Sequence, residues 1–256
     1  MIFSRRRKAA DDETPEVPAE PAAEAEVPAE PAPAEDGGEE TGEGGERDWA
    51  AFDRSRDWRA DGPFDISEVD LDADDVQRID LGSLVITPRE GMELRLQVAQ
   101  DTGAVVSAMV LIGQSALELA VFAAPRSGGL WAEIREEVVA ATRAQKGTVT
   151  LVEGPYGTEL RRLVPVTGPE GQQGYQPSRT WAAEGPRWLL RGVLYGQAAL
   201  AQGLASPADE LHDVFASTVV RRGDTAMAAG EVIPMTVPDD VAIRPAPGSQ
   251  PPAARG

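Results

Sequence analysis

The sequence contains no cysteine and a single histidine among its 256 residues, which removes several kinds of chemistry. Without cysteine there is no disulfide, no thiolate nucleophile and no cysteine-ligated metal site. Nothing in the chain requires an oxidising compartment, so we expect a cytoplasmic protein. Catalysis by a serine or threonine nucleophile needs a base beside the hydroxyl group. The position of His212 beside Asp213 predicts a solvent-facing side chain on a helix, without a catalytic role.

Basic residues are also scarce, and their distribution is uneven. The chain has 24 Lys and Arg against 43 Asp and Glu, which gives a net charge of −19. Residues 1–77 carry 8 basic and 24 acidic residues, whereas residues 78–256 carry 16 and 19. The acidic character therefore belongs to the N-terminal third, and the remainder of the chain is close to neutral.

The N-terminal third has the composition of a disordered segment. Residues 9–46 contain no basic residue and repeat proline, alanine and glutamate. Such a segment buries too little apolar surface to offset an ordering entropy of about 1 to 2 kcal/mol per residue. We therefore expect a disordered acidic tail at 1–47 and a second disordered end at 239–256.

The residues after the tail mix aromatic and charged side chains. Residues 48–76 are predicted to be an acidic docking segment or linker that includes Trp49, Phe52 and Trp58. Two interpretations are open, a short helix that docks on the domain or on a partner, and a loosely held peptide. The remaining residues, 77–238, have a suitable length for a single folded domain.

Long hydrophobic runs are missing as well. The most apolar stretch, residues 104–124, is interrupted by Gln114 and Glu118, whereas a membrane-spanning helix needs about 20 apolar residues. Its alternating pattern predicts two buried strands and no membrane span. Charges and prolines follow the basic run at 5–8 where a signal peptide requires an apolar core, so we expect no signal peptide.

Local patterns predict an α+β fold. Most of the chain alternates as strands do and is punctuated by turn residues, as in Asp101-Thr102-Gly103. The expected class is a largely antiparallel sheet of about six to eight strands with two main amphipathic helices. The expected strands are residues 78–87, 92–100, 104–112, 117–124, 148–153, 158–166, 178–183, 187–195 and a closing strand at 231–237.

The two main helices have clear boundary signals. Apolar residues recur at helical spacing from Leu130 to Gln145, and Gly147 follows the last turn. A second helix is predicted from an N-cap at Ser206, with Pro207 in its first turn, to Gly223.

Several motifs that carry chemistry are absent or incomplete. The chain has no phosphate-binding Gly-x-x-x-x-Gly-Lys-Ser/Thr sequence, and we expect no cofactor. Asp70, Asp72 and Asp74 have the alternate spacing of a calcium loop. However, Asp75 occupies the glycine position and Leu81 the position of the bidentate glutamate, so we expect no metal. The short basic run at 5–8 precedes many acidic residues, and we expect no specific nucleic-acid binding.

One cluster of residues, 184–196, is a candidate binding site. On a strand, Arg187 and Arg191 share a face, and Trp188 lies on the opposite one. Together with Arg179, and with Arg161 or Arg162, they form a candidate patch for an anion or an acidic partner, because guanidinium groups bind carboxylates and phosphates. The alternative is cross-strand pairing with Glu153, Glu159 or Glu184.

Three phrases in the chain resemble an actinobacterial family of unknown function, domain-of-unknown-function family 3710. They are Gly62-Pro63-Phe64-Asp65, residues 78–84 (RIDLGSL) and residues 185–192 (GPRWLLRG). The resemblance covers roughly residues 60–238. It implies a cytosolic protein of Gram-positive bacteria and no activity for any particular residue.

These patterns favour a binding protein over an enzyme. The leading hypothesis is a non-catalytic protein-binding or adaptor domain with an acidic solubilising tail. The alternative is an enzyme or regulator that binds an anionic small molecule such as a nucleotide, which would need arginines and carboxylates to converge in a pocket. A third hypothesis is that the tail mimics nucleic acid and the domain binds DNA-associated proteins.

Overall fold

A computed structural model describes residues 47–168 and 171–237 of the chain. Nearly all of the predicted acidic tail, 1–47, and the predicted C-terminal end, 239–256, lie outside the described residues.

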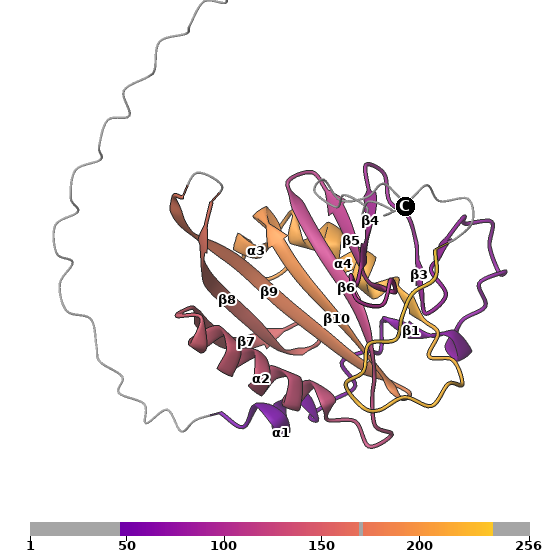
Figure 1. The fold of residues 1–256 in the computed structure, drawn as a ribbon. Helices are drawn as coiled ribbons and strands as arrows, with labels where there is room; N and C mark the ends of the chain where they lie inside the picture. The colour runs from indigo at the N-terminus through magenta and orange to yellow at the C-terminus, as the bar shows by residue number, and fades with distance from the viewer. Residues whose placement is uncertain (1–46, 169–170, 238–256) are drawn as a thin grey trace, which may run out of the picture. The chain divides into compact units, whose positions relative to one another are not determined.

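A seven-stranded antiparallel sheet forms the centre of the fold (Figure 1). Its strands lie in the order β4-β5-β6-β10-β9-β8-β7. They are β4 (Glu93–Val98), β5 (Val105–Ile112), β6 (Ser115–Ala123), β10 (Trp188–Gly196), β9 (Gln173–Gly185), β8 (Gly157–Thr167) and β7 (Thr148–Gly154). Strand β10 pairs with β6 on one side and with β9 on the other, so it connects strands β4, β5 and β6 with strands β9, β8 and β7. The predicted class and size of the sheet are confirmed.

Four short strands form a second, mixed sheet that was not predicted. They are β1 (Phe64–Asp65), β11 (Val219–Val220), β3 (Leu84–Ile86) and β2 (Ile79–Asp80), in that order. Strands β1 and β11 are parallel, and the other pairs are antiparallel. The prediction of one strand over 78–87 is wrong because the chain turns at Gly82, whose φ of 76° suits glycine.

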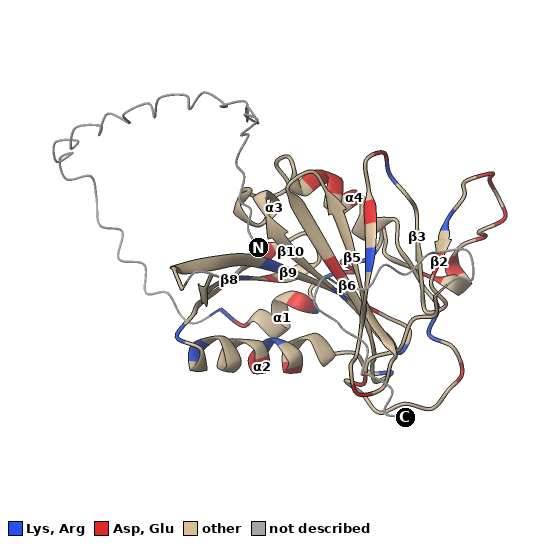
Figure 2. Cartoon of the chain, turned by 45° about the horizontal axis from the view of Figure 1, so that its top comes forward, with Lys and Arg blue, Asp and Glu red and all other residues tan. Residues whose placement is uncertain are grey.

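Helices lie on both faces of the large sheet (Figure 2). Helix α2 (Leu130–Ala144) packs against β7, β8 and β9, which confirms the helix predicted from Leu130. On the other face lie α3 (Gln197–Leu200) and α4 (Ala208–Ala216). Helix α4 approaches β10 closely at Gly192, where a Cβ would lie 2.7 Å from the Phe215 ring. A side chain at this position would push the helix away from the core.

The residues between 48 and 76 contact the folded core. They contain α1 (Trp49–Asp53), a 3₁₀ helix η1 (Ile66–Glu68) and β1. Asp53, at the end of α1, accepts hydrogen bonds from the backbone N–H and the hydroxyl of Thr158, both at 2.7 Å, and pairs with Arg135 of α2. Residues 48–76 thus contain a short helix, as one of the two interpretations of this segment expected. The division of the chain near residues 47, 76 and 238 stays a prediction.

The last predicted helix is shorter than expected. It begins at Ala208 without a side-chain cap and ends at Ala216, so Ser206 is not its N-cap and Gly223 does not end it. Val219 and Val220 leave the helix to pair with β1 and β3. Two β-branched residues in succession favour a strand over a helix terminus.

The closing segment pairs only in part. The backbone N–H of Ile233 donates to Val121 O at 2.8 Å, and that of Met235 donates to Val105 O at 2.9 Å. These contacts form isolated bridges, so the continuous strand predicted over 231–237 is wrong. Residues 104–124 fold into β5 and β6, and no helix in the described part of the chain is long and apolar enough to cross a membrane.

Candidate functional site

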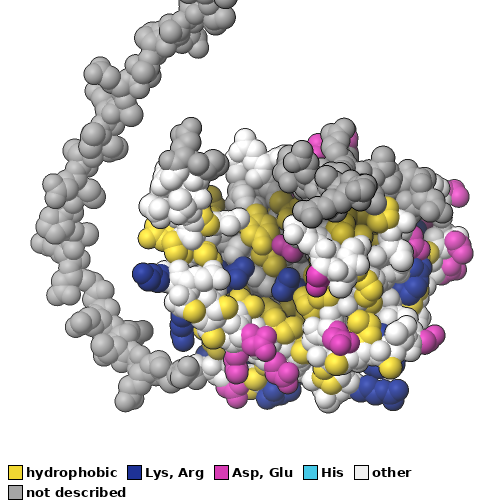
Figure 3. Space-filling model, viewed as in Figure 1, with side chains coloured by type: hydrophobic (Ala, Val, Ile, Leu, Met, Phe, Trp, Pro, Cys, Tyr) yellow, Lys and Arg dark blue, Asp and Glu magenta, His cyan; other side chains and the backbone are white. Residues whose placement is uncertain are grey.

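The candidate site lies on the face of the large sheet that carries α2. This helix packs over β7, β8 and β9, and the same face continues across β10 and β6 beyond the helix (Figure 1). A space-filling view of this face shows basic and acidic side chains next to one another in its hollowed centre (Figure 3).

Strand alternation places four polar side chains on this face of the sheet. Arg191 and Tyr195 flank Val193 along β10, and Glu118 lies directly opposite Val193 on β6. Arg162 projects from the same face of β8. We call these four residues, Arg162, Arg191, Glu118 and Tyr195, the arginine site.

Each arginine of the site has a buried donor that no described residue satisfies. The Nε atoms of Arg162 and Arg191 are buried, and neither atom forms a hydrogen bond within the described residues. Neither guanidinium forms an ion pair with a described carboxylate. Buried polar atoms are paired in the great majority of cases, and an unpaired one is explained by strain, an ordered water or a bound ligand.

The surroundings of Arg191 disfavour its charge. Burial lowers the pKa of the Arg191 guanidinium from its ordinary value, Glu118 opposes this effect, and Arg162 adds to it through like-charge repulsion. The guanidinium carbon lies 5.0 Å from the centroid of the Phe122 ring, and the face of an aromatic ring compensates a cation only in part. The side chain is a half-buried cation that Glu118 favours without forming an ion pair with it in the described structure.

Glu118 and Tyr195 form the polar edge of the site. The Tyr195 hydroxyl donates a hydrogen bond of 3.2 Å to Oε2 of Glu118. Burial, with Glu118 as the next cause, raises the pKa of Tyr195 to about 12, so the phenol remains protonated at neutral pH and continues to donate. Glu118 lies diagonally across the strand pair from Arg191, since Arg191 is opposite Ala120. It forms no ion pair with either arginine of the site in the described structure.

Arg179, one of the predicted site residues, lies on the opposite face of the sheet. Its side chain is 1% exposed, and its Nε and Nη2 donate to both oxygens of Glu159, each at 2.8 Å. The Trp181 indole also donates to Glu159, at 2.6 Å. For this arginine the cross-strand pairing interpretation is confirmed.

Arg187 is not on a strand. It lies in the turn between β9 and β10 with a φ of 63°, unlike the strand position predicted for it. Its carbonyl accepts hydrogen bonds from Ala124 N at 2.9 Å and from Nε of Arg222 at 3.1 Å. Arg222 therefore donates a hydrogen bond to this turn. It lies beyond the end of α4, although the predicted helix extended to Gly223.

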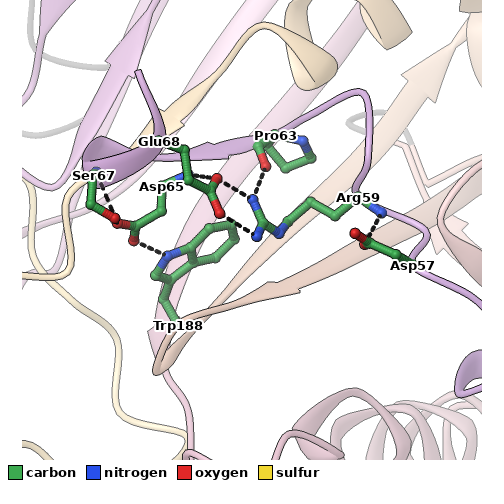
Figure 4. Close-up of polar contacts among 7 residues, drawn as sticks. All are labelled: Asp57, Arg59, Pro63, Asp65, Ser67, Glu68 and Trp188. Carbon is green, nitrogen blue, oxygen red and sulfur yellow. Dashed lines mark hydrogen bonds and ion pairs between the residues drawn. The ribbon is translucent and has the colours of Figure 1, made fainter. Parts of the chain in front are cut away.

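Trp188 is buried beneath the N-terminal segment (Figure 4). Its indole Nε1 donates to Asp65 Oδ2 at 2.7 Å, and Asp65 also accepts from the Ser67 hydroxyl at 2.6 Å. Next to it, Arg59 binds both oxygens of Glu68 at 2.6 and 2.7 Å. The four predicted residues, Arg179, Arg187, Trp188 and Arg191, therefore do not form one patch, and only Arg191 belongs to the arginine site.

The sequence offered weak signals for the rest of the site. Tyr195 shares the strand face of Arg191 by simple alternation, and Arg162 was among the possible companions of that arginine. In the sequence, Glu118 stands out only because it interrupts the apolar stretch at residues 104–124. Its place beside Arg191 depends on the pairing of β6 with β10, which no local pattern encodes.

His212 is half-buried, so the prediction of a solvent-facing side chain is wrong. Its ring stacks on Tyr156 with the centroids 5.5 Å apart, and Nε2 lies 3.2 Å from the Tyr156 hydroxyl. Burial is the main cause that lowers the pKa of His212, against an opposing effect of Asp213.

The three alternating aspartates, 70, 72 and 74, form local contacts. Asp74 pairs with Arg78 at 2.8 Å, and Asp70 accepts a hydrogen bond from the backbone N–H of Asp72. Across residues 47–168 and 171–237, no three acidic or histidine side chains cluster in a way that could hold a metal ion.

A family model described as "Protein of unknown function (DUF3710)" matches residues 62–244. The chain belongs to the DUF3710 family. The resemblance expected from the three phrases is thereby confirmed, and the description of the family names no activity. No curated protein matches this DUF3710 chain.

Two solved structures are similar to part of this DUF3710 chain. A crystal structure from Bacteroides thetaiotaomicron VPI-5482 is 12% identical, covers 56% of this chain and 47% of that chain, and has a TM-score of 0.34. The solution structure of cyanobacterial PsbP (CyanoP) from Synechocystis sp. PCC 6803 is 10% identical, covers 56% of this chain and 91% of that chain, and has a TM-score of 0.32. The chain spans about half the length of the first of these structures. Similarity at this level says nothing about what the chain binds.

Proposed function

We propose that this domain is a non-catalytic binding domain that holds an anionic ligand at the arginine site. The observation that supports the proposal is the pair of buried Nε atoms, in Arg162 and Arg191, that have no hydrogen-bond partner. Two guanidinium groups offer several N–H donors in a fixed planar arrangement that matches carboxylate and phosphate oxygens.

The electrostatic cost of placing two arginines on this face supports the same proposal. A half-buried cation without a counter-ion is unfavourable, and a second cation nearby makes it more so. An anion between the two guanidinium groups would offset both costs and satisfy the unpaired donors. Elsewhere in the fold the buried arginines Arg135 and Arg179 each have a carboxylate partner, Asp53 and Glu159.

The adaptor hypothesis and the small-molecule hypothesis use the same surface in this proposal. In the adaptor role the anionic group belongs to a protein partner that covers the open face of β10 and β6. In the alternative role it belongs to a free metabolite. A cytoplasmic location stays a prediction in either case.

The proposal is tested by NMR on the full-length chain with the arginine side chains labelled with ¹⁵N. Benzoate and phenyl phosphate serve as probes, and the Nε–Hε signals of Arg162 and Arg191 are followed during titration. We expect a saturable shift of both signals. The variants Arg162→Gln and Arg191→Gln should each abolish the response of the other arginine.

A matched control has the same charge change away from the site. Arg143 is exposed near the end of α2, and Arg143→Gln should leave both titrations unchanged. The proposal is overturned if neither probe gives a saturable shift, or if Arg143→Gln weakens binding as much as Arg191→Gln does.

A further inference from the structure

The arginine site contains an acceptor as well as donors, and this restricts its ligand. Glu118 lies on the same face as the two arginines and favours the charge of Arg191, but it forms no ion pair with either of them in the described structure. Its Oε2 accepts a hydrogen bond from Tyr195, and a carboxylate has room to accept several more. A ligand in the site therefore meets guanidinium donors on one side and a carboxylate acceptor on the other.

The charge count of the site favours a single negative charge. Two guanidinium groups and one carboxylate leave a net charge of +1 among four half-buried side chains. A carboxylate ligand brings this sum to zero, whereas a phosphate dianion leaves an excess negative charge beside Glu118. Uncompensated charge is costly where water is partly excluded.

We infer that the ligand is an N-acylated α-amino acid, with its carboxylate between Arg162 and Arg191 and its amide N–H directed to Glu118. The inference rests on the proposed function and specifies the ligand class. In such a molecule the carboxylate and the N–H donor are attached to the same carbon, so one small ligand presents both groups to the arginines of β8 and β10 and to the acceptor on β6. The C-terminal residue of a peptide has the same chemistry, because its nitrogen is acylated by the preceding residue.

The floor of the site suits the apolar part of such a ligand. Val193 lies between Arg191 and Tyr195 on β10 and opposite Glu118, and the Arg191 guanidinium lies over the Phe122 ring. An aromatic or aliphatic side chain of the ligand would cover these groups and exclude water from the ion pairs, which strengthens them.

Three matched probes separate the features of the ligand. Hippurate carries a carboxylate, an adjacent amide N–H and an aromatic ring; 3-phenylpropionate lacks the N–H; phenyl phosphate is a dianion near neutral pH. Dissociation constants are measured for the full-length chain by the NMR titration described above. Hippurate should bind about ten-fold more tightly than 3-phenylpropionate, the usual worth of a hydrogen bond to a charged group.

The variant Glu118→Gln tests the role of the acceptor directly. It keeps a side-chain oxygen for Tyr195 and removes the negative charge. Phenyl phosphate should then bind about ten-fold more tightly than to the unaltered chain, because a like charge near the ligand has been removed. The preference for hippurate over 3-phenylpropionate should shrink. An unchanged backbone amide spectrum shows that the variant is folded.

The outcomes distinguish this inference from the proposed function. If phenyl phosphate or 3-phenylpropionate binds in an Arg191-dependent way but hippurate has no advantage, the inference fails and the proposed function stands. If none of the three probes binds, both fail.

A further pair of probes identifies the source of the ligand. An N-acetylated tetrapeptide with a free C-terminus is compared with its C-terminal amide. Tighter binding of the free acid than of hippurate would support a chain terminus as the ligand, and weaker binding would support a free N-acyl amino acid. Binding of the amide as tightly as of the acid would overturn the inference.

Discussion

Arg179 and Arg191 lie on adjacent strands of one sheet, yet their surroundings are opposite in kind. Arg179 is enclosed between the sheet and the α3 segment, where Glu159 receives two of its donors and the carbonyl of Ala201 receives another at 3.2 Å. Arg191 projects from the other face over the Phe122 ring, and within the described residues its Nε has no hydrogen-bond partner and its charge is favoured by Glu118 without an ion pair. The first arrangement is complete within the chain, and the second is not.

A structural arginine differs from a candidate binding arginine in whether its donors are satisfied by other residues of the fold. A buried ion pair whose donors and acceptors are all satisfied contributes to one defined packing of the core, and removing one partner leaves an uncompensated charge. Arginines that lack partners make no such contribution to the fold, so their presence calls for another explanation. Four predictions test the comparison.

The largest effect is expected from Glu159→Ala. The change leaves the Arg179 guanidinium and the Trp181 indole without their acceptor in a site that is 1% exposed. Removing one partner of a buried pair costs about 3 to 5 kcal/mol, and urea unfolding should show a loss of this size. Should the variant not accumulate in folded form, Glu159→Gln should show a smaller loss in the same direction.

A glutamate on the neighbouring strand provides the control for this change. Glu153 on β7 pairs with Arg47, and both side chains are largely exposed. Glu153→Ala should change the free energy of unfolding by less than about 1 kcal/mol. Equal losses for Glu153→Ala and Glu159→Ala would contradict the structural role of the Arg179 pair.

A smaller effect is expected from Trp188→Phe. Phenylalanine keeps most of the buried ring but removes the N–H that donates to Asp65 at 2.7 Å. A buried acceptor left without its donor costs about 1 to 3 kcal/mol of unfolding free energy. Trp58→Phe is the control, since that indole donates only a long hydrogen bond of 3.4 Å to Phe52 O. A loss for Trp58→Phe that matches Trp188→Phe would show that the Asp65 bond is not the cause.

The third prediction concerns Arg191→Met, which should abolish anion binding with little effect on folding. The substitution replaces an unpaired half-buried cation by an apolar side chain of similar length. We expect the free energy of unfolding to increase slightly, by less than about 1 kcal/mol. A loss as large as that of Glu159→Ala would place Arg191 among the structural residues.

The smallest effect is expected from the titration of His212. Its pKa in the folded state is lowered, mainly by burial, so the unfolded chain binds this proton more readily. Stability from this group is therefore present above the unfolded pKa of about 6.5 and decreases as the pH falls through the folded pKa. A single proton contributes at most about 1.4 kcal/mol per pH unit. The variant His212→Gln should unfold in urea with a flatter dependence on pH below 6.5, and an unchanged dependence would contradict the assignment.

Several features of the fold depend on local physics and could be predicted. Helix α2 follows from apolar residues at helical spacing, because only one face of that segment can be buried. The pairing of β4 with β5, and of β7 with β8, follows from alternating strands joined by short turns. The membership of the DUF3710 family was also recognisable from short phrases.

The arrangement of the arginines was decided by tertiary structure alone. Alternation shows which neighbours share a strand face with Arg179 and with Arg191. Whether the two arginines lie on the same face of the sheet or on opposite faces depends on the register of β9 with β10. Glu118 and Arg191 are 73 positions apart in the sequence and become neighbours only because β10 lies beside β6. Composition shows which residues carry charge, and local alternation indicates most strands of the large sheet but not those of the small one. The long-range pairing of those strands decided which charges are satisfied, since a counter-ion acts only at short distance in space.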